Sequence, residues 1–281
     1  MKAGSAGSSP DGVTPPRLPA GQPLREFLHG VGEAVANLNT TVVGLDAVEK
    51  GHEKPSSLDI SWHPADRSAA ARKARRFVLE ATLVRVSEAA ATFIRAMAKL
   101  PRFTSVTARW NKNTSQAEKM ADIAQHALGS EDYLLAGASL LVHWRNRIVH
   151  SSTAQLTPTQ RKALVDASEE IEQKFARLSV ERLLSDFERG LPTLKDVSSL
   201  ISMTIRLVRA LDASARDLTE ADLHVMLDHY GLNARIAAVE RTTAPAKLEA
   251  SVVRLLQTEA PGLVEAYTTH FAQKSKARTT P

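Results

Sequence analysis

Residues 140–150 read LLVHWRNRIVH, an apolar segment that ends in arginine, asparagine and histidine. On a helix each residue turns by about 100°, so His143, Asn146 and His150 share one face of this segment. Leu141 and Ile148 lie on the other side, where they can pack against a core. The stretch therefore predicts a buried helix whose last turns carry polar side chains, and the rest of the fold is expected to be built around it.

The rest of the chain has the composition of a helical protein. Its 281 residues are 43% hydrophobic and only 5% aromatic, and the apolar positions are mostly Ala, Leu and Val. This balance favours helices over sheets, and apolar residues recur at the three- and four-residue spacing of amphipathic helices. We therefore expect an all-α fold. Residues 23–190 should form a helical bundle with an N-terminal amphipathic helix, and residues 191–272 a helical extension that serves as an adaptor or binds a partner.

Start and stop signals divide the chain into individual helices. Pro23 suits a first helical turn, whereas Pro101 and Gly129 each end a helix. Apolar and polar residues alternate at 58–62, which predicts a short extended piece there. The expected helices are residues 23–49, 68–100, 115–128, 130–150 with Ser130 as its cap, 157–178, 180–187, 193–211, 219–230, 234–241, 245–258 and 261–272.

Several classes of protein are excluded by what the sequence lacks. It has no cysteine, and its nine histidines show no metal-ligand spacing, so neither a disulfide, a metal nor a cofactor is expected. No run of about 18 apolar residues could span a membrane, and the N-terminus lacks the apolar core of a signal peptide. We expect a cytoplasmic protein with disordered tails at residues 1–22 and 273–281. A formal charge of +5 permits an acidic partner such as nucleic acid.

The polar end of residues 140–150 suits phosphodiester chemistry on RNA. RNA carries a 2′-hydroxyl beside each scissile phosphate, and this oxygen can attack the phosphorus without a metal once it has lost its proton. His150 is the candidate base, because imidazole titrates near neutral pH. Arg145 would stabilise charge on the phosphate oxygens, and Asn146 would orient the histidine or the substrate. His143 and Arg147 are candidate substrate contacts. The alternative is an ordinary polar helix end, with His143 simply packed.

The expected helix at residues 68–100 begins with a basic run. The run consists of Arg72, Lys73, Arg75 and Arg76. These four residues are candidate contacts to the phosphate backbone of RNA, which would make binding sensitive to salt. The alternative is a solvated helix face, which is the more frequent reason for such a run.

Arg145 and His150 are five residues apart, which places them about 140° apart around a helix. On a straight helix two side chains placed in this way do not point at one atom. They converge if the helix ends near His150, or if a second copy of the helix completes the cleft by twofold symmetry. The second alternative requires two copies of the chain, and a homodimer is therefore part of the prediction.

The RNxxxH sequence at residues 145–150, with an apolar approach and a polar exit, resembles the Arg-x(4–6)-His motif of the HEPN superfamily (higher eukaryotes and prokaryotes nucleotide-binding). The resemblance covers roughly residues 67–178. It implies a small helical bundle that often dimerises, with Arg145 and His150 as the catalytic pair and Asn146 as the accessory residue. Many members are metal-independent ribonucleases of toxin–antitoxin, abortive-infection and other antiphage systems, whereas others are inactive scaffolds or nucleotide-binding modules.

One position departs from that family. Active members often carry an acidic residue about one turn before the arginine, where this chain has Leu141. Glu80 or Glu88 of the expected helix at 68–100 would then have to supply a carboxylate from across the bundle. The first hypothesis is a dimeric ribonuclease, held inactive until triggered, with an antitoxin or defence-system protein as a partner. The second is a non-catalytic module that binds a partner or nucleotide, and a third, weaker one is a nucleic-acid binder driven by its basic surface.

Overall fold

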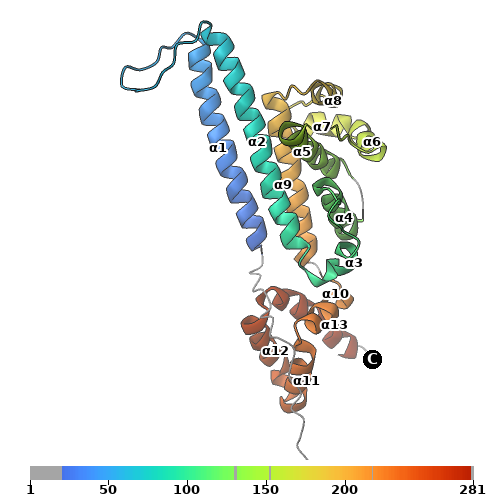
Figure 1. The fold of residues 1–281 in the computed structure, drawn as a ribbon. Coiled ribbons are helices and arrows are strands. Elements are labelled where there is room, and N and C mark those ends of the chain that lie inside the picture. The colour runs from blue at the N-terminus through green and yellow to red at the C-terminus, as the bar shows by residue number, and fades with distance from the viewer. Residues whose placement is uncertain (1–20, 130–131, 152, 217, 280–281) are drawn as a thin grey trace, which may run out of the picture. The chain divides into compact units, whose positions relative to one another are not determined.

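The protein is all-α. The computed structural model describes residues 21–129, 132–151, 153–216 and 218–279, and within these ranges it contains helices and no strand (Figure 1). The extended piece expected at residues 58–62 is irregular. Lys54 Nζ donates to the backbone carbonyls of Leu58, at 2.8 Å, and Ile60, at 3.0 Å, so these acceptors bind a side chain and not a neighbouring strand. None of the described helices is both long and apolar enough to cross a bilayer.

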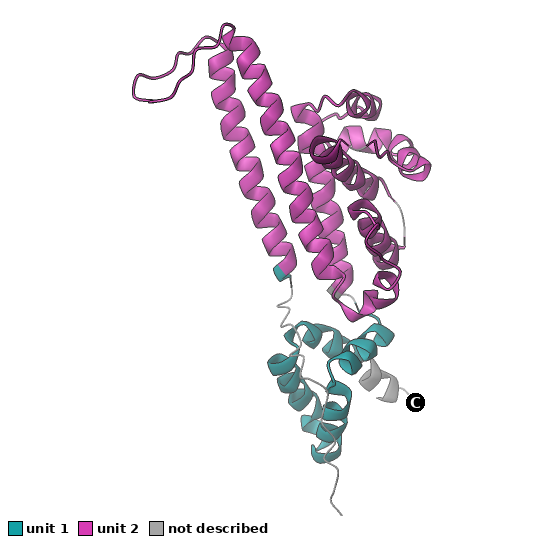
Figure 2. Ribbon diagram, in the orientation of Figure 1, with its two compact units in different colours: residues 1–22, 216–281 teal, residues 23–215 magenta. Residues whose placement is uncertain are grey.

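The chain divides into two compact units (Figure 2). Residues 23–215 form the bundle unit, and the helices after residue 215 form the C-terminal unit. The helices of the bundle unit are α1 (Gln22–Glu49), α2 (Arg67–Met97), α3 (Thr104–Thr107), α4 (Gln116–Leu128), α5 (Tyr133–His150), α6 (Pro158–Asp166), α7 (Ser168–Lys174), α8 (Val180–Arg189) and α9 (Leu194–Arg216), with a 3-10 turn at Pro101–Phe103.

The boundary between the units lies about one long helix later than the sequence indicated. We expected it at residues 190 and 191, but α9 belongs to the bundle unit. The reason is that α9 carries an apolar stripe at helical spacing, which packs into the bundle core. The buried residues of this stripe are Val197, Leu200, Met203, Leu207 and Leu211.

Helix α5 lies at the centre of the bundle core. Each residue from Leu135 to Trp144 is buried, which confirms the expected buried helix. On one side α5 packs against α2, and on another Gly137 lies against Met203 of α9. A Cβ atom at Gly137 would lie 3.2 Å from Met203 Cβ and closer still to its Sδ, so glycine allows the close approach of these two helices. In Figure 1, α2 lies between α1 and α9 and runs antiparallel to α1.

Capping residues set most helix ends where the sequence placed them. Ser115 and Glu118 form a capping box at the start of α4, and Gly129 ends that helix with φ of 69°. Helix α5 begins at Tyr133, capped by Asp132, and the expected cap Ser130 lies outside the described residues. The helix expected at 157–178 is two helices, α6 and α7. Its backbone leaves helical geometry at Ala167, where acidic residues begin the first turn of α7.

The C-terminal unit contains α10 (Glu220–His229), α11 (Leu232–Thr242), α12 (Pro245–Glu259), a 3-10 turn at Pro261–Leu263 and α13 (Val264–Thr279). These helices agree with the expected ranges except at the end of the chain. A tail was expected from residue 273, but α13 continues to Thr279, since the Gln, Lys, Ala and Arg residues of this segment are good helix formers. Residues 1–20, also expected to be a tail, lie outside the described residues, as do residues 280 and 281.

Candidate functional site

The candidate site lies at the C-terminal end of α5. The helix ends at His150 because Ser151 takes a left-handed conformation, with φ of 51°, and its N–H donates to the carbonyl of Arg147 at 3.1 Å. From Leu135 to Trp144 the helix is buried, Arg145 is half-buried, and His150 is exposed. The last turns of α5 therefore emerge from the core to the surface of the bundle.

Arg145 joins three other side chains into one cluster. Its Nη1 donates to Asn146 Oδ1, at 3.2 Å, and lies 2.7 Å from His150 Nε2. Its Nη2 donates to Glu88 Oε1, at 2.7 Å. The Arg145 side chain is 20% exposed and that of Glu88 45% exposed. We refer to Glu88, Arg145, Asn146 and His150 as the Arg145 cluster, which a ligand can reach from solvent.

The contact between Arg145 and His150 forms within one chain. The sequence left two alternatives, a helix that ends near His150 or a second copy of the helix that completes the cleft. The first applies, because α5 ends at His150. The angle around the helix is bridged by the length of the arginine side chain. Since a guanidinium can only donate, Nε2 of His150 is the acceptor if this contact is a hydrogen bond.

The carboxylate of the cluster comes from α2. Of the two candidates, Glu88 reaches Arg145, whereas Glu80 accepts a bond from Arg76 Nε at 2.8 Å. Leu141, at the position where the resemblance implies an acid, is fully buried in the core. A carboxylate at that position would lie in an apolar environment, which is costly for a charged group.

Arg147 has other neighbours than the Arg145 cluster. The Arg147 guanidinium carbon lies 3.7 Å from the centroid of the Phe187 ring, and Nη1 donates to the Phe187 carbonyl at 2.5 Å. Trp144 packs edge-on against the same ring, at 5.2 Å. Burial lowers the pKa of Arg147. Burial also lowers the pKa of His143, and the Arg147 charge adds to this effect. His143, Trp144, Arg147 and Phe187 form the Arg147 cluster.

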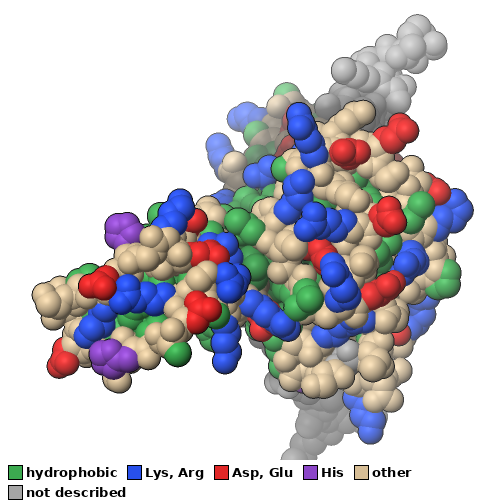
Figure 3. Space-filling model, turned by 90° about the horizontal axis from the view of Figure 1, so that it is seen from above, with side chains coloured by type: hydrophobic (Ala, Val, Ile, Leu, Met, Phe, Trp, Pro, Cys, Tyr) green, Lys and Arg blue, Asp and Glu red, His purple; other side chains and the backbone are tan. Residues whose placement is uncertain are grey.

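The basic run of α2 lies about 18 Å or more along the helix from Glu88, at 1.5 Å per residue. Its ion pairs are Arg72 and Arg75 with Glu49 of α1, at 3.4 and 3.3 Å, and Arg76 with Glu80, at 2.8 Å. Lys73 is exposed. Figure 3 views the bundle from the end at which α1 is joined to α2, and shows acidic and basic side chains intermingled. The run thus fastens α2 to α1, and the structure does not bring it to the Arg145 cluster.

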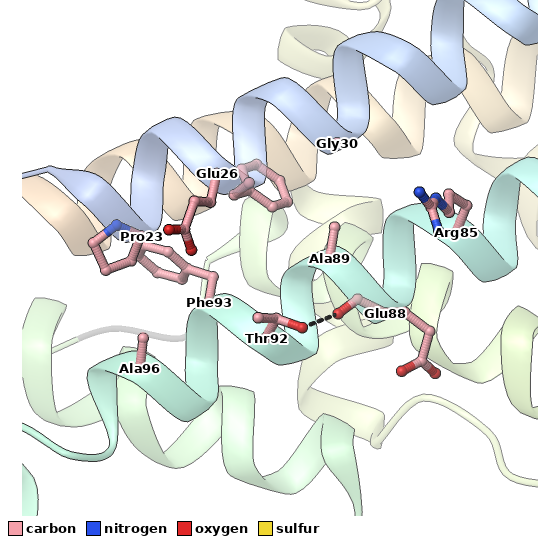
Figure 4. A pocket seen from close by; sticks show the side chains of 10 residues that line it. Pro23, Glu26, Gly30, Arg85, Glu88, Ala89, Thr92, Phe93 and Ala96 are labelled. Atoms are coloured by element: carbon pink, nitrogen blue, oxygen red, sulfur yellow. Dashed lines mark hydrogen bonds between the residues drawn. The ribbon is translucent and has the colours of Figure 1, made fainter.

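Two hollows flank Glu88 on α2. The first, of about 420 Å³, is lined by Phe77, Glu80, Ala81, Val84, Arg85, Glu88 and Ile148. The second, of about 260 Å³, lies between α1 and α2 (Figure 4). Arg85 and Glu88 line both, and the Glu88 carboxylate points away from α1 in Figure 4. Arg85 was not named from the sequence, although its position three residues before Glu88 places the two on neighbouring parts of one helix face.

Nothing in the described ranges resembles a metal centre, since they contain no group of three or more His, Asp or Glu side chains that could hold an ion. Comparisons of this chain with protein-family models, curated proteins and solved structures find no match. The function is therefore inferred from the geometry of the Arg145 cluster and from the motif that forms it.

Proposed function

We propose that this protein is a metal-independent endoribonuclease of the HEPN type, and that it acts as a toxin or antiphage-defence effector. The observation that carries the proposal is the 2.7 Å contact between Arg145 Nη1 and His150 Nε2, at a solvent-accessible helix end. A guanidinium and an imidazole at this separation can address one phosphodiester together. Asn146 and Glu88 supply further polar groups around the same arginine.

In the proposed reaction, Nε2 of His150 takes the proton of an RNA 2′-hydroxyl. The 2′-oxygen forms a bond to the adjacent phosphorus, and the bond from phosphorus to the 5′-oxygen breaks. The leaving 5′-oxygen takes a proton from water, so the products are a 2′,3′-cyclic phosphate and a 5′-hydroxyl. Arg145 donates to the phosphate oxygens, on which negative charge accumulates, and Asn146 keeps the guanidinium oriented.

A non-catalytic HEPN-type module that binds a protein partner or a nucleotide is the second candidate. Two observations favour it, since Leu141 replaces the family acid and Arg145 is already paired with Glu88. Such a module would bind its ligand and leave RNA intact, so a cleavage assay separates the two candidates.

The proposed partners are RNA, a second copy of this chain, and an antitoxin or defence-system protein. A second copy is not needed to bring Arg145 to His150. The support for a homodimer is instead the hollow beside the cluster, where the Phe77 side chain is 70% exposed among other apolar residues. We include a neutralising protein because a ribonuclease that acts as a toxin or defence effector has to be restrained in its own cell.

The experiment expresses the wild-type chain and the variants Arg145→Ala and His150→Ala from an inducible promoter, and examines total RNA and tRNA. We expect the wild type to slow growth and fragment RNA, and the purified protein to cleave RNA in EDTA. Both variants should relieve the growth defect and leave RNA intact, whereas the control His52→Ala, an exposed histidine outside the cluster, should behave as wild type. Cleavage that persists in both cluster variants would place the site elsewhere.

A further inference from the structure

The hydrogen bonds of Arg145 limit how it can bind a phosphate. A guanidinium has five N–H groups. In this structure Nη1 contacts both His150 and Asn146, Nη2 donates once to Glu88, and Nε is buried without a hydrogen-bond partner. One N–H of Nη2 is left for a ligand. Because a guanidinium binds phosphate best through two parallel N–H groups, an incoming phosphate must displace one of the present partners.

Glu88 is the partner that most resembles a phosphate. It presents an anionic oxygen to Nη2 at 2.7 Å, in a charge-assisted hydrogen bond. Its side chain is 45% exposed, so it can turn away into solvent without leaving an empty space in the core. His150 and Asn146, by contrast, carry no negative charge and lie on the same helix as Arg145.

We propose that the Glu88 carboxylate occupies the position on Arg145 that a phosphate oxygen of RNA takes, so that Glu88 and RNA compete for one guanidinium. The choice of RNA as the ligand rests on the proposed function. Displacement of Glu88 frees Nη2 for the phosphate, while Nη1 keeps its contacts with His150 and Asn146. Without RNA, the chain therefore keeps Arg145 engaged by a carboxylate of its own.

Arg85 offers a place for the displaced carboxylate. It lies three residues before Glu88 on α2, a spacing at which two side chains of a helix meet. Arg85 is exposed, and in the part of the chain that the structure describes it forms no ion pair or hydrogen bond. Both residues line the same two hollows, of which Figure 4 shows the one between α1 and α2. The exchange thus moves the Glu88 carboxylate from Arg145 of α5 to Arg85 of α2.

The test measures the affinity of the full-length protein for a short fluorescent 2′-O-methyl RNA of randomised sequence, which cannot be cleaved. Glu88→Gln keeps the shape of the side chain and removes its charge, so we expect binding about tenfold tighter than wild type. Glu88→Ala should show the same direction of change. The matched control is Glu80→Gln, which removes a charge from the same hollow but does not contact Arg145, and it should change the affinity by less than about twofold.

A double-mutant cycle links the effect to Arg145. In the Arg145→Ala background, Glu88→Gln should leave the affinity for RNA unchanged, because the guanidinium for which Glu88 and RNA compete is absent. Equal or weaker binding by Glu88→Gln and Glu88→Ala, or a gain that persists without Arg145, would overturn the proposal. If the wild type cleaves no RNA but the variants show the expected affinities, the catalytic proposal is wrong and the competition between Glu88 and RNA stands. If the wild type cleaves RNA but the variants do not show these affinities, the competition is wrong and the catalytic proposal stands.

Discussion

At the end of α5, Arg145 and Arg147 lie two residues apart and have different neighbours. Arg145 contacts the side chains of Glu88, Asn146 and His150 at the surface. Arg147 lies over the Phe187 ring and donates to a backbone carbonyl. Helical geometry separates the two by about 200° around the axis, so each faces a different part of the bundle.

The difference shows that two arginines at the end of one helix can have quite different surroundings, and that only Arg145 suits the proposed catalytic role. Arg145 is surrounded by titratable and polar groups that a substrate can replace, whereas Arg147 is surrounded by an aromatic ring and a carbonyl that hold α8 against α5. We therefore expect substitutions of Arg145 to affect activity more than stability, and substitutions of Arg147 to affect stability more than activity.

The largest expected effect is on RNA cleavage by Arg145→Ala. The rate should fall by about 100-fold or more, since a group that stabilises phosphate charge is lost. Arg145→Lys should remain impaired, because an ammonium lacks the paired donors of a guanidinium. Initial rates of cleavage in EDTA provide the measurement, and urea unfolding should show a stability change below about 1 kcal/mol. A variant that loses stability and activity together would remove the contrast with Arg147.

The next effect concerns Gly137, which sets the distance of α5 from α9. Gly137→Ala would place a methyl group against the Met203 side chain, so we expect a loss of about 1–3 kcal/mol in the free energy of unfolding. Gly44→Ala is the matched control, because a Cβ there meets nothing within 4 Å, and it should gain about 0.4–1 kcal/mol. Urea denaturation of both variants measures the difference. An unchanged stability in Gly137→Ala would show that α5 is packed less closely than described.

Arg147→Ala should lower the free energy of unfolding by about 1–2 kcal/mol, because it removes a cation–π contact and a hydrogen bond to the Phe187 carbonyl. Its effect on the cleavage rate should be much smaller than that of Arg145→Ala. The control is Arg161→Ala, which removes an ion pair between exposed side chains and should cost less than about 1 kcal/mol. A cleavage defect in Arg147→Ala as deep as that of Arg145→Ala would assign Arg147 to the substrate.

The smallest effect is a dependence of stability on pH that arises from His143. Burial lowers the pKa of this histidine in the folded state below the usual 6.5. The unfolded chain therefore binds a proton at a higher pH than the folded chain, and stability falls as the pH is lowered through about 6.5. His143→Gln should lose this part of the pH dependence, whereas His52→Gln should keep it. Urea midpoints across this range provide the test, and identical profiles for wild type and His143→Gln would contradict it.

Much of the fold follows from local signals in the sequence. The apolar run that ends at Trp144 predicts the buried half of α5, and Ser115 and Gly129 fix the ends of α4, because caps act through neighbouring backbone groups. The end of the bundle unit was misplaced since a boundary depends on which core a helix joins. The stripe on α9 shows a buried face but does not say where it packs.

The candidate site was predictable in its residues but not in its contacts. The RNxxxH pattern identifies Arg145, Asn146 and His150. The angle between two positions on a helix, however, gives the direction of their Cβ atoms and not the position of the guanidinium at the end of a long arginine side chain. The choice between Glu80 and Glu88 depends on how α2 is turned against α5, which no local pattern encodes. Likewise, the ion pairs of Arg72 and Arg75 depend on Glu49, which follows from the pairing of α1 with α2.

The central claim is that Arg145 and His150 cleave RNA by attack of its own 2′-hydroxyl. It is tested most directly by the chemistry of the RNA ends produced by the purified protein in EDTA. We predict 2′,3′-cyclic phosphate and 5′-hydroxyl ends with the wild type, and none of these ends with His150→Ala. Fragments with 3′-hydroxyl and 5′-phosphate ends, or the same cyclic ends from His150→Ala, would contradict it.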